Sequence, residues 1–238
     1  MIAQVTVLAS FAKDKFLDER HRVHHERLGG PALFIRHALE REGIDFVLED
    51  SLAGVVEIDV HERGTIVKVP PRRSIDFAAV ATPYLLISTL RDEVDLAGVD
   101  QYRGKVFLDV QGYVRSDRGS GSKAMWQAPE SVTRSVLCLR GTSEELEYID
   151  TEWLTYQKNE GILLRTMGAK GCELFVQGTQ HHILPARVVS TTNTVGAGDT
   201  FFASFLAHFT RTADAEESAH HAMERVSQFL ALPEENRL

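Results

Sequence analysis

Uninterrupted apolar runs recur along the chain and predict strands that are buried on both faces. A strand inside a parallel sheet is apolar throughout, because helices cover both of its sides. The runs are short and carry many β-branched residues, as buried strands do. They lie at residues 2–9, 78–89, 105–112, 135–141 and 162–168.

Segments with helical spacing of apolar residues separate these runs. Pro31 suits a first helical turn and Gly43 suits a helix end, which predicts a helix over 31–43. Strands that alternate with helices predict an α/β, doubly wound fold with a mostly parallel sheet. We also expect helices over 143–161, 198–210 and 213–232, a helix-compatible crossover over 92–104, and antiparallel strands over 172–178 and 181–189.

One segment has a different period. Residues 54–70 alternate apolar and polar side chains on both sides of HERGT, which predicts a β-hairpin with one exposed face. We interpret it as a small, reduced lid within a single domain of residues 1–238, because a closed site keeps water from a reacting phosphate. Its exposed face is also a candidate homodimer surface.

Composition and charge narrow the function class. The chain of 238 residues has a formal net charge of -8 and no long basic run, which argues against nucleic acid or a membrane surface as partner. No apolar stretch reaches the roughly 20 residues that cross a bilayer as a helix, and we expect no targeting segment. Cys138 and Cys172 are the only cysteines, which favours a reducing, cytoplasmic location.

The string TTNTVGAGDTFFASFLAHF carries the strongest chemical signal. Gly196, Ala197 and Gly198 precede Asp199, and an apolar helix follows directly. Small residues at a helix N-terminus let backbone N–H groups approach an anion, and the helix dipole adds about half a positive charge there. Asp199 could accept the proton of an attacking hydroxyl during phosphate transfer. The alternative is that Asp199 only caps the helix and the glycines only turn the chain.

The segment VGAGDTFFASFL resembles the signature of the ribokinase-like (PfkB) carbohydrate kinases. A Walker A string, the other common phosphate motif, does not occur in the chain. The resemblance implies an ATP-dependent carbohydrate or polyol kinase with Asp199 as catalytic base and Gly196, Ala197 and Gly198 as anion hole. It also implies Mg2+ as cofactor and ATP as co-substrate.

Further residues resemble family landmarks in the same order along the chain. Asp14 is similar in position to the acidic residue that holds substrate hydroxyls, and Gly29 and Gly30 match a substrate-side double glycine. RTMGAKG resembles the segment beside the nucleotide phosphates, where glycines allow close backbone approach. The nucleotide-binding candidates are Thr166, Gly168 and Gly171.

The segment TSEELEYI resembles the family's NxxE motif, whose Glu organises magnesium and its water shell. Glu145 takes that position, which implies a metal role through water; the alternative is a solvated helix carboxylate. The pattern departs from the family at two places. Thr142 stands where the motif has Asn, and Asn193 stands where the signature begins with Asp. The second change removes a charge from the region where many relatives hold a monovalent cation.

Only resemblance to one branch of the family indicates which acceptor class the chain would use. GGPALFIRHAL and FLDVQGYVR resemble the inositol-kinase-like branch, which implies a cyclic polyol held by Asp14, the double glycine, Gln111 and Arg115. Polar residues at a strand end also cap loops in many doubly wound sheets. Two alternatives remain open: a nucleoside kinase of the same fold, and a catalytically weak relative that binds sugar, polyol or nucleotide without turnover.

Overall fold

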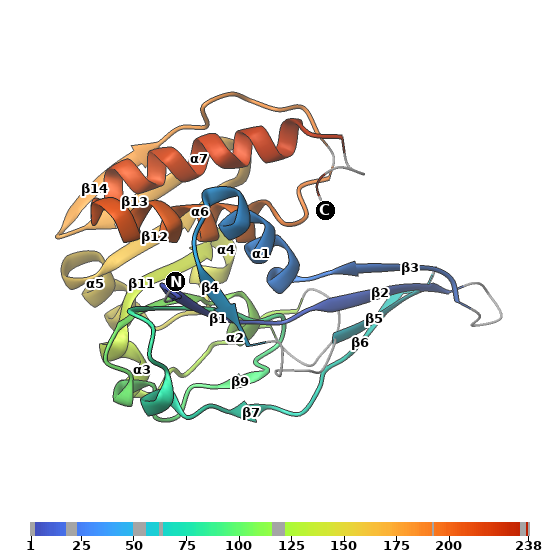
Figure 1. Cartoon of the computed structure of the whole chain (residues 1–238), viewed down its shortest axis with the longest axis horizontal. Coiled ribbons are helices and arrows are strands. Elements are labelled where there is room, and N and C mark those ends of the chain that lie inside the picture. The colour runs from blue at the N-terminus through green and yellow to red at the C-terminus, as the bar shows by residue number, and fades with distance from the viewer. Residues whose placement is uncertain are drawn as a thin grey trace.

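The computed structural model describes residues 3–17, 23–49, 56–61, 64–115, 122–191, 193–233 and 237. Its centre is an eight-stranded sheet with the order β14-β13-β12-β11-β10-β8-β1-β4 (Figure 1). Pairings are parallel from β4 to β12 and antiparallel at β13 and β14. The strands are β1 (Val5–Ala9), β4 (Phe46–Leu48), β8 (Tyr84–Ser88), β10 (Lys105–Asp109), β11 (Val136–Thr142), β12 (Ile162–Thr166), β13 (Cys172–Val176) and β14 (Thr179–Ile183).

Helices cover both faces of this sheet, so the predicted doubly wound α/β class is confirmed. One face carries α1 (Pro31–Glu42), α6 (Ala197–Thr212) and α7 (Ala215–Ala231), whose apolar side chains share one core with the sheet. The other face carries shorter helices that share a second core. These are α2 (Gln111–Val114), α3 (Glu130–Ser135), α4 (Ser143–Leu146) and α5 (Thr151–Glu160).

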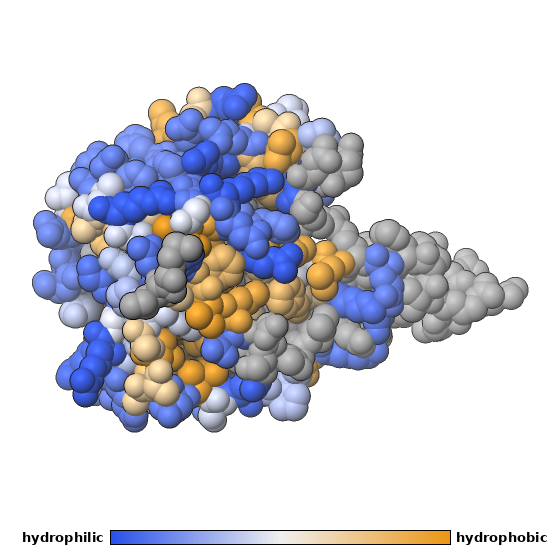
Figure 2. Space-filling view, in the orientation of Figure 1, coloured by the Kyte–Doolittle hydropathy of each residue, from blue (hydrophilic) through white to orange (hydrophobic). Residues whose placement is uncertain are grey.

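Strand alternation explains how one strand supplies both cores. In β1, Val5 and Val7 lie in the core beneath α1 and α6, whereas Leu8 lies in the opposite core. All three side chains are fully buried, and burial of each contributes about 1.5–3 kcal/mol. In Figure 2 apolar residues gather near the centre of this face of the molecule, below an upper part that is largely polar.

Some crossovers differ from the sequence prediction. Residues 92–104 contain no α-helix; they hold strand β9 (Val94–Asp95) and the 3₁₀ helix η2 (Val99–Gln101). Strand β9 pairs with β7 (Arg73–Ser74), and two further 3₁₀ helices are η1 (Phe77–Ala79) and η3 (Gly168–Lys170). The predicted helix over 143–161 is divided into α4 and α5, because Asp150 caps a new helix through the amides of Glu152 and Trp153.

The predicted hairpin is part of a larger sheet. Strands β5 (Val56–His61) and β6 (Gly64–Lys68) pair as expected, and the turn at 62–63 lies outside the described residues. Strand β5 also pairs with β2 (Ala12–Leu17), which pairs with β3 (Val23–Gly29), giving the order β3-β2-β5-β6. The sequence of residues 10–28 predicts only a polar connection. Strands β2 and β3 lie in this segment, but they carry many charges and have no apolar run that would mark them as strands. Figure 1 shows this second sheet projecting from the body beside the first turn of α1.

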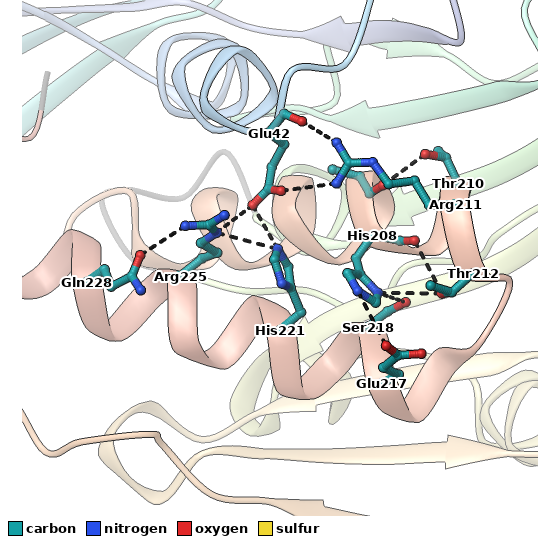
Figure 3. Close-up of polar contacts among 11 residues, drawn as sticks. Glu42, His208, Thr210, Arg211, Thr212, Glu217, Ser218, His221, Arg225 and Gln228 are labelled. Atoms are coloured by element: carbon teal, nitrogen blue, oxygen red, sulfur yellow. Dashed lines mark hydrogen bonds and ion pairs between the residues drawn. The ribbon is translucent and has the colours of Figure 1, made fainter.

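Glu42 ties α1 to α6 and α7 (Figure 3). Its side chain is 3% exposed, and Oε1 lies 2.9 Å from His221 Nε2 and 2.8 Å from Arg225 Nε. Arg211 donates to the Glu42 backbone carbonyl and lies 3.4 Å from Oε2. Burial opposes the charged form of Glu42, but the His221 and Arg225 contacts lower the pKa of the carboxyl overall.

None of the described helices is long and apolar enough to cross a membrane.

Replacing Glu42 with Gln should lower the free energy of unfolding by about 1–3 kcal/mol at pH 7, because a buried charge-assisted network loses its acceptor. Since the pKa of Glu42 is lowered in the folded state, this stabilisation is present above its unfolded pKa. It is lost as the pH falls through the folded pKa. Urea unfolding at pH 7 and at low pH measures both effects. The control is Glu40→Gln on the same helix, where the exposed carboxylate should contribute less than about 0.5 kcal/mol. Equal losses in the two variants would contradict this role.

Candidate functional site

The candidate site lies where the carboxyl ends of β8, β10, β11 and β12 meet the first turn of α6. In doubly wound sheets ligands bind at this edge, because the strand ends and helix N-termini leave polar backbone groups there. Four side chains gather at this edge: Ser88, Asp109, Arg140 and Asp199.

The glycines of the GAGD motif shape the start of α6. Gly196 has φ 81°, a left-handed conformation that favours glycine, and a Cβ there would overlap the ring of Phe34. A Cβ on Gly198 would overlap the guanidinium of Arg140. The first glycine therefore turns the chain, and the second lets a buried cation approach the backbone.

The first amides of α6 form the part of the candidate site that an anion could approach. Ala197 N–H donates to the Thr194 carbonyl at 3.1 Å, so this amide already has a partner. The next two amides, from Gly198 and Asp199, belong to the first turn, whose N–H groups have no acceptor within the helix. The dipole of a 16-residue helix adds partial positive charge at the same place.

Asp199 lies half-buried in that first turn. Ser88 Oγ donates to its Oδ1 at 3.5 Å. Burial, followed by the negative charge of Asp109, raises the pKa of Asp199 to about 7, although Arg140 and Arg115 act in the opposite direction. A carboxyl with this pKa can both accept and release a proton near neutral pH.

Asp109 and Arg140 form a buried ion pair beneath the motif. Arg140 Nη1 lies 2.5 Å from Asp109 Oδ2, and the two side chains are 5% and 0% exposed. Arg140 Nη2 also lies 3.4 Å from Thr166 Oγ1, while its buried Nε has no partner among the described residues. Burial lowers the pKa of Arg140, but Asp109 and then Glu145 outweigh it and keep the pKa above its usual range. The guanidinium is therefore charged.

A cavity of about 330 Å³ opens beside this ion pair. All three nucleotide-binding residues predicted from sequence, Thr166, Gly168 and Gly171, line it. At Gly171 (φ 92°) a Cβ would overlap the Ile183 carbonyl, so close backbone approach requires glycine there. Ala197 and Gly198 line the same cavity. Its remaining wall is mainly apolar and includes Pro185, Val188, Val189, Met223, Val226 and Leu230.

The predicted substrate-side residues occupy the border with the projecting sheet. Gly29 ends β3, and Gly30 (φ 89°) caps α1 and packs tightly on the backbone of Ser10 and Ala12. Asp14 pairs through its backbone with Arg27 and Ile58; its side chain lies outside the described residues.

Gln111 and Arg115 lie at the two ends of α2, close to the carboxylates of the site. The backbone N–H of Gln111 donates to Asp109 Oδ1 at 3.0 Å. Arg115 Nη1 donates to the Leu90 carbonyl at 3.3 Å, and its charge acts on Asp199. The structure thus brings Arg115 within electrostatic reach of Asp199.

Glu145 is engaged in a helix cap. Its Oε2 accepts from the Thr142 amide at 2.8 Å, and Thr142 Oγ1 accepts from the Glu145 amide at 3.1 Å. Thr142 and Glu145 thus form a capping box, and Glu145 is buried. Among the described residues, no group of three or more His, Cys, Asp or Glu side chains is arranged to hold a metal. These residues do not build a metal site of their own.

Sequence reasoning missed Ser88 and Arg140. Ser88 ends an apolar run and offers no motif, so its contact with Asp199 depends on the fold. Arg140 could have been found from one feature of the sequence, its charge inside the apolar run 135–141. A charge in a buried strand needs a partner.

Comparisons with known proteins bear on the fold and on the family resemblance. Residues 150–225 match the family described as pfkB family carbohydrate kinase. Comparison with curated proteins gives no significant match.

Several solved structures share the fold over nearly the whole chain. A pyrophosphate-dependent kinase in the ribokinase family, complexed with a pyrophosphate analogue and myo-inositol, has a TM-score of 0.69 and 18% identity, with 94% of this chain and 93% of that chain covered. The Arabidopsis thaliana ribokinase complexed with ribose and ATP has a TM-score of 0.68 and 18% identity, with 98% and 94% covered. A nucleoside kinase of Burkholderia thailandensis in complex with inosine has a TM-score of 0.66 and 14% identity, with 96% and 91% covered.

The fold and the sequence match point in the same direction. At these identities the structural likeness establishes the fold, and the match over residues 150–225 includes the GAGD segment. The chain therefore has the ribokinase fold, and its resemblance to the ribokinase-like (PfkB) carbohydrate kinases is confirmed.

Proposed function

We propose that the protein is a kinase that transfers the γ-phosphate of ATP to a hydroxyl of a sugar or polyol. The observation that carries this proposal is the position of Asp199. A carboxyl with a pKa of about 7 lies in the same helix turn as the amides of the anion site, beside a cavity of about 330 Å³. Base and anion site are thus parts of one rigid element.

In the proposed reaction Asp199 accepts the proton of the acceptor hydroxyl. The hydroxyl oxygen then forms a bond to the γ-phosphorus, the bond between that phosphorus and the β,γ-bridging oxygen breaks, and ADP leaves with the electron pair. The amides of Gly198 and Asp199 and the charge of Arg140 stabilise the negative charge on the transferred group. Ser88 holds the Asp199 carboxyl through its hydrogen bond.

Magnesium enters this proposal as part of the MgATP substrate. The ion neutralises phosphate charge when bound to the donor. The described residues do not form a cluster that would hold it, and Glu145 is engaged in the capping box. Any contact between Glu145 and the ion would therefore pass through water.

The apolar wall of the cavity favours a nucleotide over pyrophosphate as donor. Val188 is 79% exposed at the cavity rim, where a purine base can cover it. Pyrophosphate has no apolar part that would use this wall. One of the similar solved structures is nevertheless that of a pyrophosphate-dependent kinase, so pyrophosphate is the alternative donor that must be tested.

A sugar or cyclic polyol is the acceptor class that we favour. The acceptor would lie between Asp199 and the projecting sheet, near Gly29, Gly30 and Arg115. A nucleoside is the alternative acceptor, and a similar solved structure holds inosine. A catalytically weak relative is the second alternative, supported by the engaged carboxylate of Glu145.

The primary experiment measures phosphorylation of myo-inositol, hexoses, pentoses and nucleosides, each with MgATP and with magnesium pyrophosphate. We expect turnover with MgATP on one acceptor class. Asp199→Asn should lower kcat about 10²–10⁴-fold, because general-base catalysis is lost while the fold remains. If the donor binds but no acceptor gives product, the result would favour the alternative of a catalytically weak relative. Unchanged turnover in Asp199→Asn would refute the role of Asp199 as base.

The pKa of Asp199 predicts opposite effects on activity and stability. As the pH rises through about 7 the carboxyl ionises, so kcat/KM should rise and then level off. The folded-state pKa is raised, so its contribution to stability is present below the unfolded pKa and is lost as the pH rises through about 7. Asp199→Asn should therefore be more stable than the wild type at pH 8 by about 1–3 kcal/mol, with little difference at pH 4. Urea unfolding at both pH values measures this, and no gain at pH 8 would argue against a raised pKa.

The donor proposal predicts a selective effect at the apolar cavity wall. Val188→Glu should raise KM for MgATP about tenfold with little change in kcat, because a base packs poorly on a carboxylate. Inhibition by tripolyphosphate, which has no base, should not change. Leu184→Glu is the matched control, since Leu184 is also an exposed apolar residue but does not line the cavity. An equal effect in both variants would contradict the proposal that the base packs on this wall.

A further inference from the structure

Arg237 is a buried cation close to the start of the GAGD segment. It is 6% exposed, and its guanidinium lies among four oxygen atoms from two separate parts of the chain. Nε donates to the Leu232 carbonyl at 3.0 Å, and Nη2 donates to the Leu230 carbonyl at 2.7 Å. Nη1 donates to the Asn193 carbonyl at 2.6 Å, and Nη2 lies 3.3 Å from Thr191 Oγ1.

These oxygens surround the positive charge of Arg237. The described partners of Arg237 are carbonyl and hydroxyl oxygens, the ligands that hold a weakly hydrated monovalent cation. Leu230 and Leu232 lie at the C-terminal end of α7, where the helix dipole adds partial negative charge. The guanidinium thus supplies a positive charge that the surrounding dipoles favour.

One path of contacts joins Arg237 to the anion site through the backbone. The backbone N–H of Asn193 donates to Thr191 Oγ1 at 3.3 Å, and the side-chain Oδ1 of Asn193 accepts from the backbone N–H of Val195 at 3.1 Å. This turn leads directly into Gly196 and the first turn of α6. A shift of the Asn193 carbonyl therefore moves the amides that would face the transferred phosphate.

A second path runs through aromatic rings. The Arg237 guanidinium lies 5.8 Å from the centroid of the Phe229 ring, and Phe229 meets Phe34 edge-on at 6.0 Å. Phe34 fills the space beside the missing side chain of Gly196. Both paths end at the same glycine, so Arg237 supports the start of the motif.

We propose that Arg237 is a positioning residue that acts as a tethered monovalent cation and orders the turn before the anion site. This inference rests on the proposed kinase function for its catalytic effect. It means that the wild-type protein needs no dissolved monovalent cation. Removal of the guanidinium leaves an oxygen-lined gap that a small cation from solution can fill.

The test compares the wild type, Arg237→Lys and Arg237→Ala in choline buffer, with guanidinium or K⁺ added at up to about 50 mM. In choline the wild type should keep its activity, and Arg237→Ala should lose about 10- to 100-fold in kcat with the acceptor KM within about twofold. Guanidinium or K⁺ should restore much of the loss with saturation, and urea at the same concentration should not. Arg237→Lys should lie between the other two, because it keeps the charge but loses the planar fork.

Arg41→Ala is the matched control. Arg41 lines the same hollow of about 250 Å³ as Arg237, but it is exposed, and its variant should keep wild-type activity in every buffer. Full activity of Arg237→Ala in choline would overturn the inference. So would a folded Arg237→Ala protein whose lost activity no cation restores.

Tripolyphosphate binding separates this inference from the kinase proposal. Calorimetry should show weaker tripolyphosphate binding by Arg237→Ala in choline, and recovery when guanidinium is added. If the wild type has no turnover but this pattern holds, the kinase proposal fails and the cation role stands. If turnover occurs but Arg237→Ala binds and reacts like the wild type, the cation role fails alone.

Discussion

Arg140 places a positive charge in the interior at the point where four strands end beneath α6. An isolated guanidinium there would be strongly disfavoured by desolvation, and the fully buried Asp109 beside it offsets that cost. The pair also requires that position 198 has no side chain, because a Cβ on Gly198 would overlap the guanidinium. The glycine motif, the ion pair and the cavity beside them are therefore one arrangement.

The ionisation of Asp199 follows from the same pair. Burial and Asp109 raise its pKa, while Arg140 and Arg115 lower it, and the balance lies at about 7. Loss of either member of the ion pair would disturb this balance. A structural ion pair thus also sets the proton affinity of the candidate base.

Helix α6 joins the site to the core. Its side chains Phe201, Phe202 and Phe205 are buried against the sheet, while its first turn carries Asp199 and the anion-binding amides. Glu42 fixes the far end of the helix layer through Arg211, His221 and Arg225 (Figure 3). Because the helix cannot shift without disturbing this packing, the amides keep their position relative to the strand ends.

The sequence by itself determined the fold class and located the candidate site. Apolar runs alternating with helical segments identify a doubly wound sheet, and GAGD before an apolar helix predicts an anion site, because both are local patterns. Only the tertiary structure decided which side chains surround Asp199. Ser88 and Arg140 are distant from it in sequence, and strands β2 and β3 carry too many charges to be recognised as strands until they pair with the hairpin. Arg237 likewise acquires its contacts only when the end of α7 is placed beside Asn193, since its four oxygens come from two separate segments. Local propensity follows from neighbouring residues, whereas buried charges are decided by partners that only the folded chain brings together.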